Sequence, residues 1–230
     1  MTKSIVISSG HGKYVAGASC YIDEVTEARR VVSKVADYFK ELSVDVTEYH
    51  DNTSRTQSAN VNGIVAYHNK QARDLDISVH FNAASKTDAA RGVEVLYYSE
   101  GDLAAKVSKA IAEASGLKNR GAKKRTDLGF LKRTNKPAIL IEVCFVDSKA
   151  DVAAYEDKFD EICRAIAESV SGKKLAVAKP ASAKKYHTIK KGETVSELAR
   201  KYDTTIAKIK ELNELDAKYT IHIGQKLRVK

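Results

Sequence analysis

The sequence predicts an α/β fold with a mostly parallel sheet flanked by helices, followed by a small βααβ module. Three observations support this prediction. Strand-like and helix-like segments alternate along residues 1–172. Several strand-like segments are nearly unbroken apolar runs, which is typical of sheets that are covered on both faces. The composition then changes at Gly172, where Lys, Ala and Pro replace the periodic pattern.

The elements of the first part follow from hydrophobic spacing. Apolar residues recur every three or four positions from Glu24 to Leu42, which indicates a helix. The same spacing continues from Leu103 to Ala114, and Gly116 ends that helix. Further helical segments follow the last strand and run to about Val170. Apolar runs indicate strands at residues 4–8, 44–48, 77–81, 92–98 and 138–146.

The last quarter of the chain reads as a linker and a separate module. Residues 173–185 contain Lys, Ala and Pro without a helical stripe, which favours a linker. Residues 186–230 begin and end with short strand-like segments, at 186–190 and 226–229, with helix-like stretches at 195–202 and 206–213 between them. We therefore expect domains at 1–172 and 186–230, joined by the linker 173–185.

Composition and cysteine content exclude several protein classes. Apolar residues make up 43% of the 230 residues, which supports a packed core. No run approaches the roughly 18–20 apolar residues of a membrane-spanning helix. The apolar run at residues 4–8 is too short for a secretory signal, so we expect a protein made in the cytoplasm without a signal peptide. The three cysteines lack CxxC spacing, which argues against a disulfide scaffold or a cysteine zinc site.

The net charge of +9 is confined to the end of the chain. Residues 1–172 contain 24 basic and 24 acidic residues, whereas residues 173–230 contain 15 basic and 6 acidic residues. Within the first part, the segment from Lys118 to Lys136 holds eight basic residues and one acid and is expected to be a basic loop. This pattern suits a polyanionic partner, such as a bacterial wall polymer or a nucleic acid.

Two predicted strands carry polar residues suited to chemistry. Alternation along residues 77–82 places Ser78, His80 and Asn82 on one face, which indicates that this face borders a cleft. Glu142 interrupts the apolar run 138–146, and an unpaired buried carboxylate costs several kcal/mol. Glu142 must therefore be paired with a cation, bound to a metal or protonated.

A third candidate lies in a turn after the first strand. His11 stands between Gly10 and Gly12, at the carboxyl edge of the sheet where α/β folds bind ligands. Two histidines and a carboxylate from separate elements would form a catalytic zinc site with one open position. Glu24 and Glu27 both lie in the first turn of the predicted helix, where acids also favour the helix dipole, and either can supply that carboxylate.

These segments resemble the zinc-dependent N-acetylmuramoyl-L-alanine amidases of the amidase-3 type, especially those of phage endolysins. The resemblance covers about residues 1–172 and rests on segments in family order: residues 5–11, Glu24, residues 78–83, 119–122, 128–131 and 137–147. The resemblance implies one Zn²⁺ per chain, held by His11, Glu24 and His80. It favours Glu24 over Glu27 because the helix is then apolar where the family's helix is apolar.

The same resemblance implies a reaction. Glu142 would act as the catalytic acid/base, and zinc-activated water would cleave the amide between N-acetylmuramic acid and L-alanine of the peptidoglycan stem peptide. Asn82, Arg120, Lys123 and Lys124 are the residues expected to contact the stem peptide. The competing interpretation of the basic segment is a solvated loop without substrate contact.

The last 45 residues resemble a LysM module, which binds glycans that contain N-acetylglucosamine. The resemblance rests on residues 186–195, Leu198-Ala199, Leu212-Asn213 and residues 223–227. Carried over to this chain, it implies a glycan site at Gly192, Glu193, Thr194, Asn213 and Ile221. The expected protein is a monomer that acts on the bacterial cell wall after its release.

Two other function classes remain as alternatives. A cysteine-dependent wall peptidase would use Cys144 with His80, although burial in an apolar strand usually makes a thiol inert. A nucleic-acid binder is favoured only by the positive charge, and the neutral first part contains no recognisable nucleic-acid motif. We therefore expect peptidoglycan, and no nucleic acid, as the partner.

Overall fold

The computed structural model describes residues 2, 4–175, 185–202, 204–216 and 219–229. The chain forms two compact units, residues 1–175 and 176–230, called here the larger and the smaller unit. Most of the predicted linker 173–185 lies outside the described residues.

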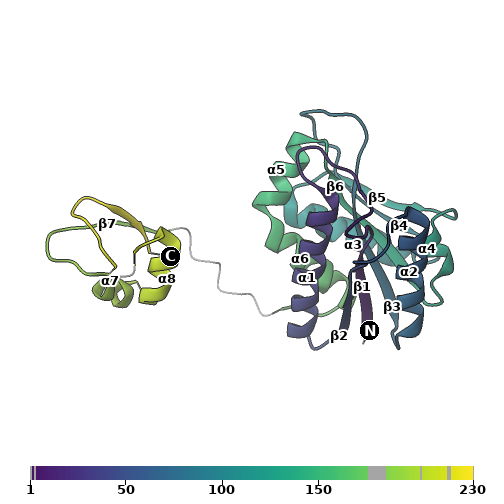
Figure 1. Ribbon diagram of the computed structural model, residues 1–230, viewed down its shortest axis with the longest axis horizontal. Coiled ribbons are helices and arrows are strands. Elements are labelled where there is room, and N and C mark those ends of the chain that lie inside the picture. Colours follow the sequence, from purple (N-terminus) through teal and green to yellow (C-terminus); the bar gives the residue numbers. More distant parts are fainter. Residues whose placement is uncertain (1, 3, 176–184, 203, 217–218, 230) are drawn as a thin grey trace. The chain divides into compact units, whose positions relative to one another are not determined.

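The larger unit is built on one six-stranded sheet with the order β2-β1-β3-β6-β4-β5 (Figure 1). All neighbouring strands are parallel except β4 and β6, which pair in antiparallel fashion. The predicted mostly parallel sheet is therefore confirmed. The strands are β1 (Ser4–Ser9), β2 (Asp45–Tyr49), β3 (Leu75–Asn82), β4 (Val93–Tyr97), β5 (Asn119–Lys124) and β6 (Ala138–Phe145).

Helices cover both faces of this sheet. The main core lies between the sheet and the helices α1 (Glu24–Glu41), α3 (Gly101–Ser115) and α6 (Phe159–Ser171), with α5 (Lys149–Asp157) beside them. A smaller core on the opposite face packs α2 (Gln57–Lys70) and α4 (Gly129–Arg133) against Leu96 and Leu140 (Figure 1). Neighbouring residues of β3 therefore alternate between two different environments.

The register of the central strands aligns the residues that the sequence singled out. His80 of β3 lies directly opposite Glu142 of β6, and Glu142 also lies opposite Glu94 of β4. Beyond Glu142, β6 contains one more residue than β3 before Phe145 pairs with Asn82, which is a β-bulge. Three ionisable side chains thus stand side by side on three neighbouring strands.

Two parts of the fold differ from the sequence prediction. The segment 118–136 is not a simple loop, because it contains the strand β5 and the short helix α4. Helix α2 was not predicted, since its sheet-facing side carries the polar residues Asn60 and His68 as well as Ile64 and Val65. The apolar stripe that reveals a helix in a sequence is half missing there.

Buried polar contacts replace that stripe. His68 is completely buried, and its Nδ1 atom lies 2.8 Å from the Asp76 carboxylate. Because a carboxylate only accepts hydrogen bonds, Nδ1 carries the proton. Nε2 of the neutral ring then accepts the hydroxyl of Ser8 at 3.0 Å. Arg73 also donates to both oxygens of Asp76, so this network joins α2 to β1 and β3.

The smaller unit has the predicted βααβ order. Strands β7 (Tyr186–Thr188) and β8 (Lys226–Arg228) pair in antiparallel fashion around α7 (Val195–Lys201) and α8 (Ile206–Asn213). Thr194 caps α7 and forms a capping box with Glu197. This unit has its own apolar core, made by Ile189, Val195, Leu198, Ala199, Ile209, Leu215, Leu227 and Val229.

Among the described residues, no helix has the length and apolar character needed to cross a membrane.

The His68 network predicts a specific pH dependence of stability. Burial lowers the pKa of His68 below its ordinary value of 6.5, although Asp76 opposes the shift. The unfolded chain therefore binds more protons than the folded chain as the pH falls. The stabilisation by the His68 network is complete above about pH 6.5 and is lost as pH falls through the lower native pKa. We expect His68→Gln to reduce the free energy of unfolding by about 1–3 kcal/mol near neutral pH. The difference in the free energy of unfolding between wild type and variant should shrink by up to about 1.4 kcal/mol for each pH unit below neutrality.

Urea unfolding of both proteins at about pH 7.5 and 5.5 measures this difference. The other histidines are present in both proteins, so their contributions cancel. A deficit that stays constant across this range would contradict a neutral, buried His68.

Candidate metal centre and catalytic cleft

Three side chains that could hold a metal ion meet at the carboxyl edge of the sheet. His11 lies in the turn after β1, Glu24 is the first residue of α1, and His80 projects from β3. One ligand atom from each of them lies within 4.8 Å of the others. The strand order places β1 beside β3, which brings the two histidines together from distant parts of the sequence.

Glu24 holds this group together. Its Oε1 atom lies 3.0 Å from Nδ1 of His80 and accepts the backbone N–H of Phe81. Its Oε2 atom accepts the backbone N–H of Ala18 at 2.7 Å and lies 3.5 Å from Nε2 of His11. The carboxylate is almost completely buried, and these donors compensate for its removal from water.

Two glycines make room for the group. A Cβ atom on Gly10 would lie 1.7 Å from Nε2 of His80, and a Cβ atom on Gly17 would lie 2.6 Å from Oε2 of Glu24. Neither glycine has a positive φ, so the requirement here is space rather than backbone freedom. The close approach of the two backbone segments explains the glycine before His11.

The two histidines have opposite electrostatic tendencies. Burial lowers the pKa of His11, with Glu24 opposing it. Burial also disfavours the charged form of His80, but the hydrogen bond to Glu24 and the charge of Glu142 outweigh it and raise the pKa of His80. Burial likewise opposes ionisation of Glu24, but its contacts with His80 keep the pKa of Glu24 below the usual range.

Glu142 is a different kind of acid. Its Oε2 atom is buried and has no hydrogen-bond partner among the described residues. Burial raises the pKa of Glu142 to about 7, with the charges of Glu24 and Glu94 adding to the shift and His80 opposing it. A carboxyl group with a pKa near neutrality can both accept and release a proton.

The structure separates the two glutamates that the sequence left open. Glu24 contacts both histidines, whereas Glu27 accepts the hydroxyl of Tyr155 at 2.6 Å and an N–H of Arg30 at 3.1 Å. The carboxylate brought to the histidines is therefore that of Glu24.

The cysteine alternative is not supported by the geometry. Cys144 belongs to the main core on the α1 side of the sheet, whereas Glu142 and His80 point to the opposite face. Burial raises the pKa of the Cys144 thiol well above its usual value. A buried thiol of this kind is a poor nucleophile.

The residues expected to contact substrate divide into two groups. Asn82 and Arg120 meet at Glu94, which accepts Nδ2 of Asn82 at 2.9 Å and Nε of Arg120 at 2.7 Å. Glu94 is not among the residues predicted from the sequence, although an acid between Val93 and Val95 in an apolar strand is the same signal that identified Glu142.

Lys123 and Lys124 are both exposed, and they lie on opposite faces of β5. Successive residues of β5 point to opposite faces. Lys123 pairs with Leu96 on the cleft side, whereas Lys124 pairs with Tyr97, which packs on the main core. Only Lys123 therefore shares the face of Glu94.

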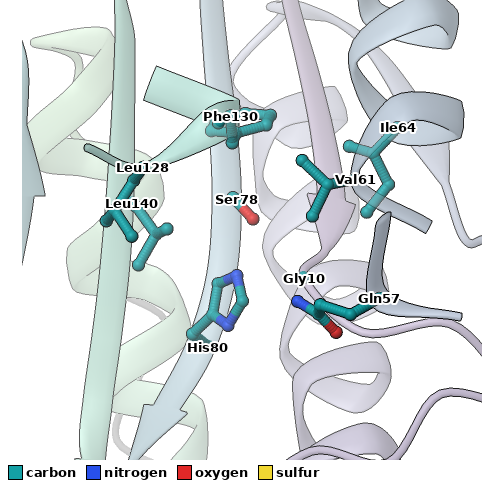
Figure 2. Close-up of a pocket in the computed structure, with 10 residues that line it drawn as sticks. Gly10, Gln57, Val61, Ile64, Ser78, His80, Leu128, Phe130 and Leu140 are labelled. Atoms are coloured by element: carbon teal, nitrogen blue, oxygen red, sulfur yellow. The ribbon is translucent and has the colours of Figure 1, made fainter. Parts of the chain in front are cut away.

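A cavity of about 90 Å³ adjoins the imidazole of His80. Figure 2 shows Ser78 and His80 on β3, facing Val61 and Ile64 of α2 across this cavity. The remaining lining is mostly apolar, formed by Gly10, Gln57, Leu128, Gly129, Phe130 and Leu140.

The donor set fits zinc. Two imidazoles and one carboxylate are the protein ligands of many catalytic zinc sites, which keep a further position for water or substrate. The glycine-lined space around His80 and Glu24, and the short distances between the donor atoms, are consistent with such a centre.

Comparison with known proteins agrees with this site. Residues 5–172 match the amidase-3 family, described as N-acetylmuramoyl-L-alanine amidase. The chain belongs to this family. Residues 187–230, within the smaller unit, match the LysM domain.

Relatives of this chain occur among clostridial and phage proteins. An uncharacterized protein of Clostridium perfringens is 30% identical over 177 residues, covering 74% of this chain and 52% of the relative. The endolysin of Bacillus phage SPP1 is 28% identical, covering 74% of this chain and 66% of the relative. The chain thus spans about half the length of the first of these relatives.

A solved structure supports the same fold. The catalytic domain of an endolysin targeting Clostridium difficile superimposes with a TM-score of 0.67 at 27% identity. The match covers 76% of this chain and 99% of that domain.

The LysM unit contains a groove of about 360 Å³. Glu193, Thr194 and Ile221 line it, as the sequence analysis expected, together with Val195, Ser196, Ile206 and Tyr219. Gly192 and Asn213 are not among the lining residues. Gly192 supplies a turn with a φ of +86°, and the side chain of Asn213 bonds the backbone of Ile209 and Arg228.

We expect Gly10→Ala to lower the zinc content of this amidase-3 unit. The new methyl group occupies the position of the His80 ring, so the ring must move away from Glu24. Gly63→Ala is the matched control, because its Cβ atom meets only ordinary contacts, the nearest at 3.8 Å.

Elemental analysis after dialysis measures zinc in both variants, with His80→Ala as the reference for a lost ligand. Full zinc occupancy in Gly10→Ala would contradict the assignment of His80 as a ligand.

Proposed function

We propose that this chain is a peptidoglycan hydrolase that cleaves the amide bond between N-acetylmuramic acid and L-alanine of the stem peptide. The observation that carries the proposal is the register pair of His80 and Glu142. It places a carboxyl group, whose buried Oε2 atom has no hydrogen-bond partner among the described residues, beside a cluster of two histidines and a glutamate. Membership of the amidase-3 family supports the choice of bond.

His11, Glu24 and His80 are proposed to hold one zinc ion per chain. When bound, zinc supplies Lewis acidity that polarises a carbonyl group and lowers the pKa of water toward about 7. Glu142 takes the proton of the attacking water on its carboxylate and delivers it to the nitrogen of the leaving alanine. The raised pKa of Glu142 suits both transfers.

Asn82 and Arg120 are proposed to contact the stem peptide. Both side chains meet at Glu94, on the same cleft face as Glu142. Lys123 adds positive charge at the exposed part of β5 on that face. Lys124, which lies on the other face, takes no part in this proposal.

The LysM unit is proposed to attach the enzyme to the bacterial cell wall. Its groove, lined by Glu193, Thr194 and Ile221, is the proposed site for glycans containing N-acetylglucosamine. We propose a catalytic domain at residues 1–172, a linker at 173–185 and the LysM module at 186–230, acting as a monomer. The whole net charge of +9 lies after residue 172, which favours attraction to an anionic wall.

Digestion of purified walls tests the reaction. We expect new alanine amino termini without new reducing sugars, identified by mass spectrometry. Glu142→Gln should slow their release by roughly 10²- to 10⁴-fold, because the amide cannot carry the proton. Its zinc content should match that of the wild type, since Glu142 is not a proposed ligand. New reducing ends, or a variant that lacks zinc, would contradict the assigned roles.

Removal of residues 176–230, which leaves the larger unit whole, tests the division of labour. We expect hydrolysis of a small soluble N-acetylmuramoyl peptide to stay near the wild-type rate, because all proposed site residues precede Gly172. Binding to intact walls should fall sharply, and part of the lost binding should be sensitive to salt.

Ile206→Ser in the full chain serves as a control that alters the groove without changing net charge. It should weaken the part of wall binding that chitin oligosaccharides compete for, and leave the salt-sensitive part. Equal loss of activity on soluble peptides and walls after truncation would show that the module helps to build the catalytic site.

A further inference from the structure

Glu94 is a buried acid that the proposed reaction does not use. It lies on β4 directly opposite Glu142, and only 9% of its surface is exposed. Both of its oxygens are occupied, Oε1 by Asn82 and Oε2 by Arg120. Because the strand order is β3-β6-β4-β5, this one carboxylate connects residues from both sides of the strand that carries Glu142.

The contact fixes one side of the Arg120 guanidinium. Its Nε atom donates to Glu94, and its guanidinium carbon lies 5.0 Å from the ring centroid of Phe145. In the described part of the chain we find no hydrogen bond from its two Nη groups, and 35% of the side chain is exposed. An arginine held in this way presents two parallel donors, a geometry that matches a carboxylate.

The charge of the cleft explains why such a group is useful. Glu24 and Glu94 are buried beside the cleft, and Glu142 stands opposite Glu94 on β6. A substrate carboxylate on this side is favoured where a cation faces it. Arg120 lies on the same side as these acids and pairs with Glu94 through Nε alone. Its remaining donors can therefore neutralise a substrate carboxylate.

The spacing indicates which carboxylate. β5 lies two strands from β6, which is about 10 Å at the usual spacing between strands. In an extended peptide, two residues span about 7 Å, and an arginine side chain covers the remainder. L-Alanine offers no free carboxylate, because its carboxyl group forms the next peptide bond. A carboxylate at this distance from the scissile bond therefore belongs to the second residue of the stem peptide.

We propose that Glu94 is a positioning residue that fixes Arg120 to bind the free carboxylate of the second stem-peptide residue. The proposal rests on the proposed amidase function. It makes the enzyme selective for stem peptides whose second residue carries this carboxylate over peptides in which it is amidated. Glu94 acts through Arg120 and does not itself touch the substrate.

The test uses two soluble N-acetylmuramoyl peptides that differ only in amidation of this carboxylate. For the wild-type full chain, we expect kcat/KM to favour the free acid by roughly 10-fold or more, mainly through KM, since a charged hydrogen-bonded pair is lost in the amide. This measurement needs no variant. Equal cleavage of both peptides would overturn the proposal, whereas cleavage of neither would overturn the amidase function itself.

Variants then separate positioning from structure. Arg120→Gln should remove the preference, so that kcat/KM falls roughly 10-fold more for the free acid than for the amidated peptide. Glu94→Gln should also reduce the preference for the free acid. The double variant should show the same preference as Arg120→Gln alone, because both changes act on one contact. Arg120→Lys should restore only part of the preference, since it keeps the charge but loses the paired donors.

Lys124→Gln is the matched control, with the same charge change on the same strand but on the opposite face. It should leave the preference unchanged. Thermal unfolding and zinc content are measured for each variant. If Glu94→Gln and Arg120→Gln slowed both peptides equally, the pair would be a structural contact and the proposal would be wrong.

Discussion

The candidate site depends on the register of three neighbouring strands. Pairing of β3, β6 and β4 places His80, Glu142 and Glu94 in one row across the sheet. Because side chains alternate along a strand, a slip of one residue in β6 would send Glu142 into the main core. The apolar residues on both sides of Glu142 prevent that slip, since they fill the core only in the observed register. Core packing therefore positions the chemistry.

Buried acids in this cleft are distinguished by their partners. Glu24 has two backbone N–H groups and two imidazoles, and Glu94 has an amide and a guanidinium. Glu142 alone among these three keeps a buried oxygen without a hydrogen-bond partner in the described part of the chain. A carboxyl oxygen without fixed donors is free to exchange a proton. Burial opposes ionisation of Glu24, but its contacts with His80 keep the pKa of Glu24 below the usual range. Three chemically equal side chains thus have three different environments, which suit the different roles proposed for them.

The sequence predicted the elements whose own pattern is apolar, and it failed where packing is polar. Helix α1 and strand β6 are recognisable because nearly every buried position in them is apolar. The sequence predicted a basic loop where strand β5 lies, because Lys and Arg are three of its six residues. The strand also lies at the edge of the sheet. His11, His80 and Glu142 stood out as polar residues in strands or glycine turns. Glu94 had the same signal, but its partner Arg120 lies on another strand, and a single sequence does not show such pairs.

Helix α2, which the pattern did not reveal, is also the helix that fixes the position of His11. Near its end, His68 ties it to β1 and β3 through Ser8 and Asp76. Near its start, Asn60 donates to the backbone carbonyl of Gly10 at 2.8 Å, within a buried environment. This hydrogen bond therefore helps to hold the turn that carries His11, together with the one from the Gly10 N–H to the Val79 carbonyl. Polar residues on the buried face of α2 weaken the apolar pattern by which a helix is recognised in a sequence. They are present there because a directional hydrogen bond sets the position of a backbone more closely than apolar contact does.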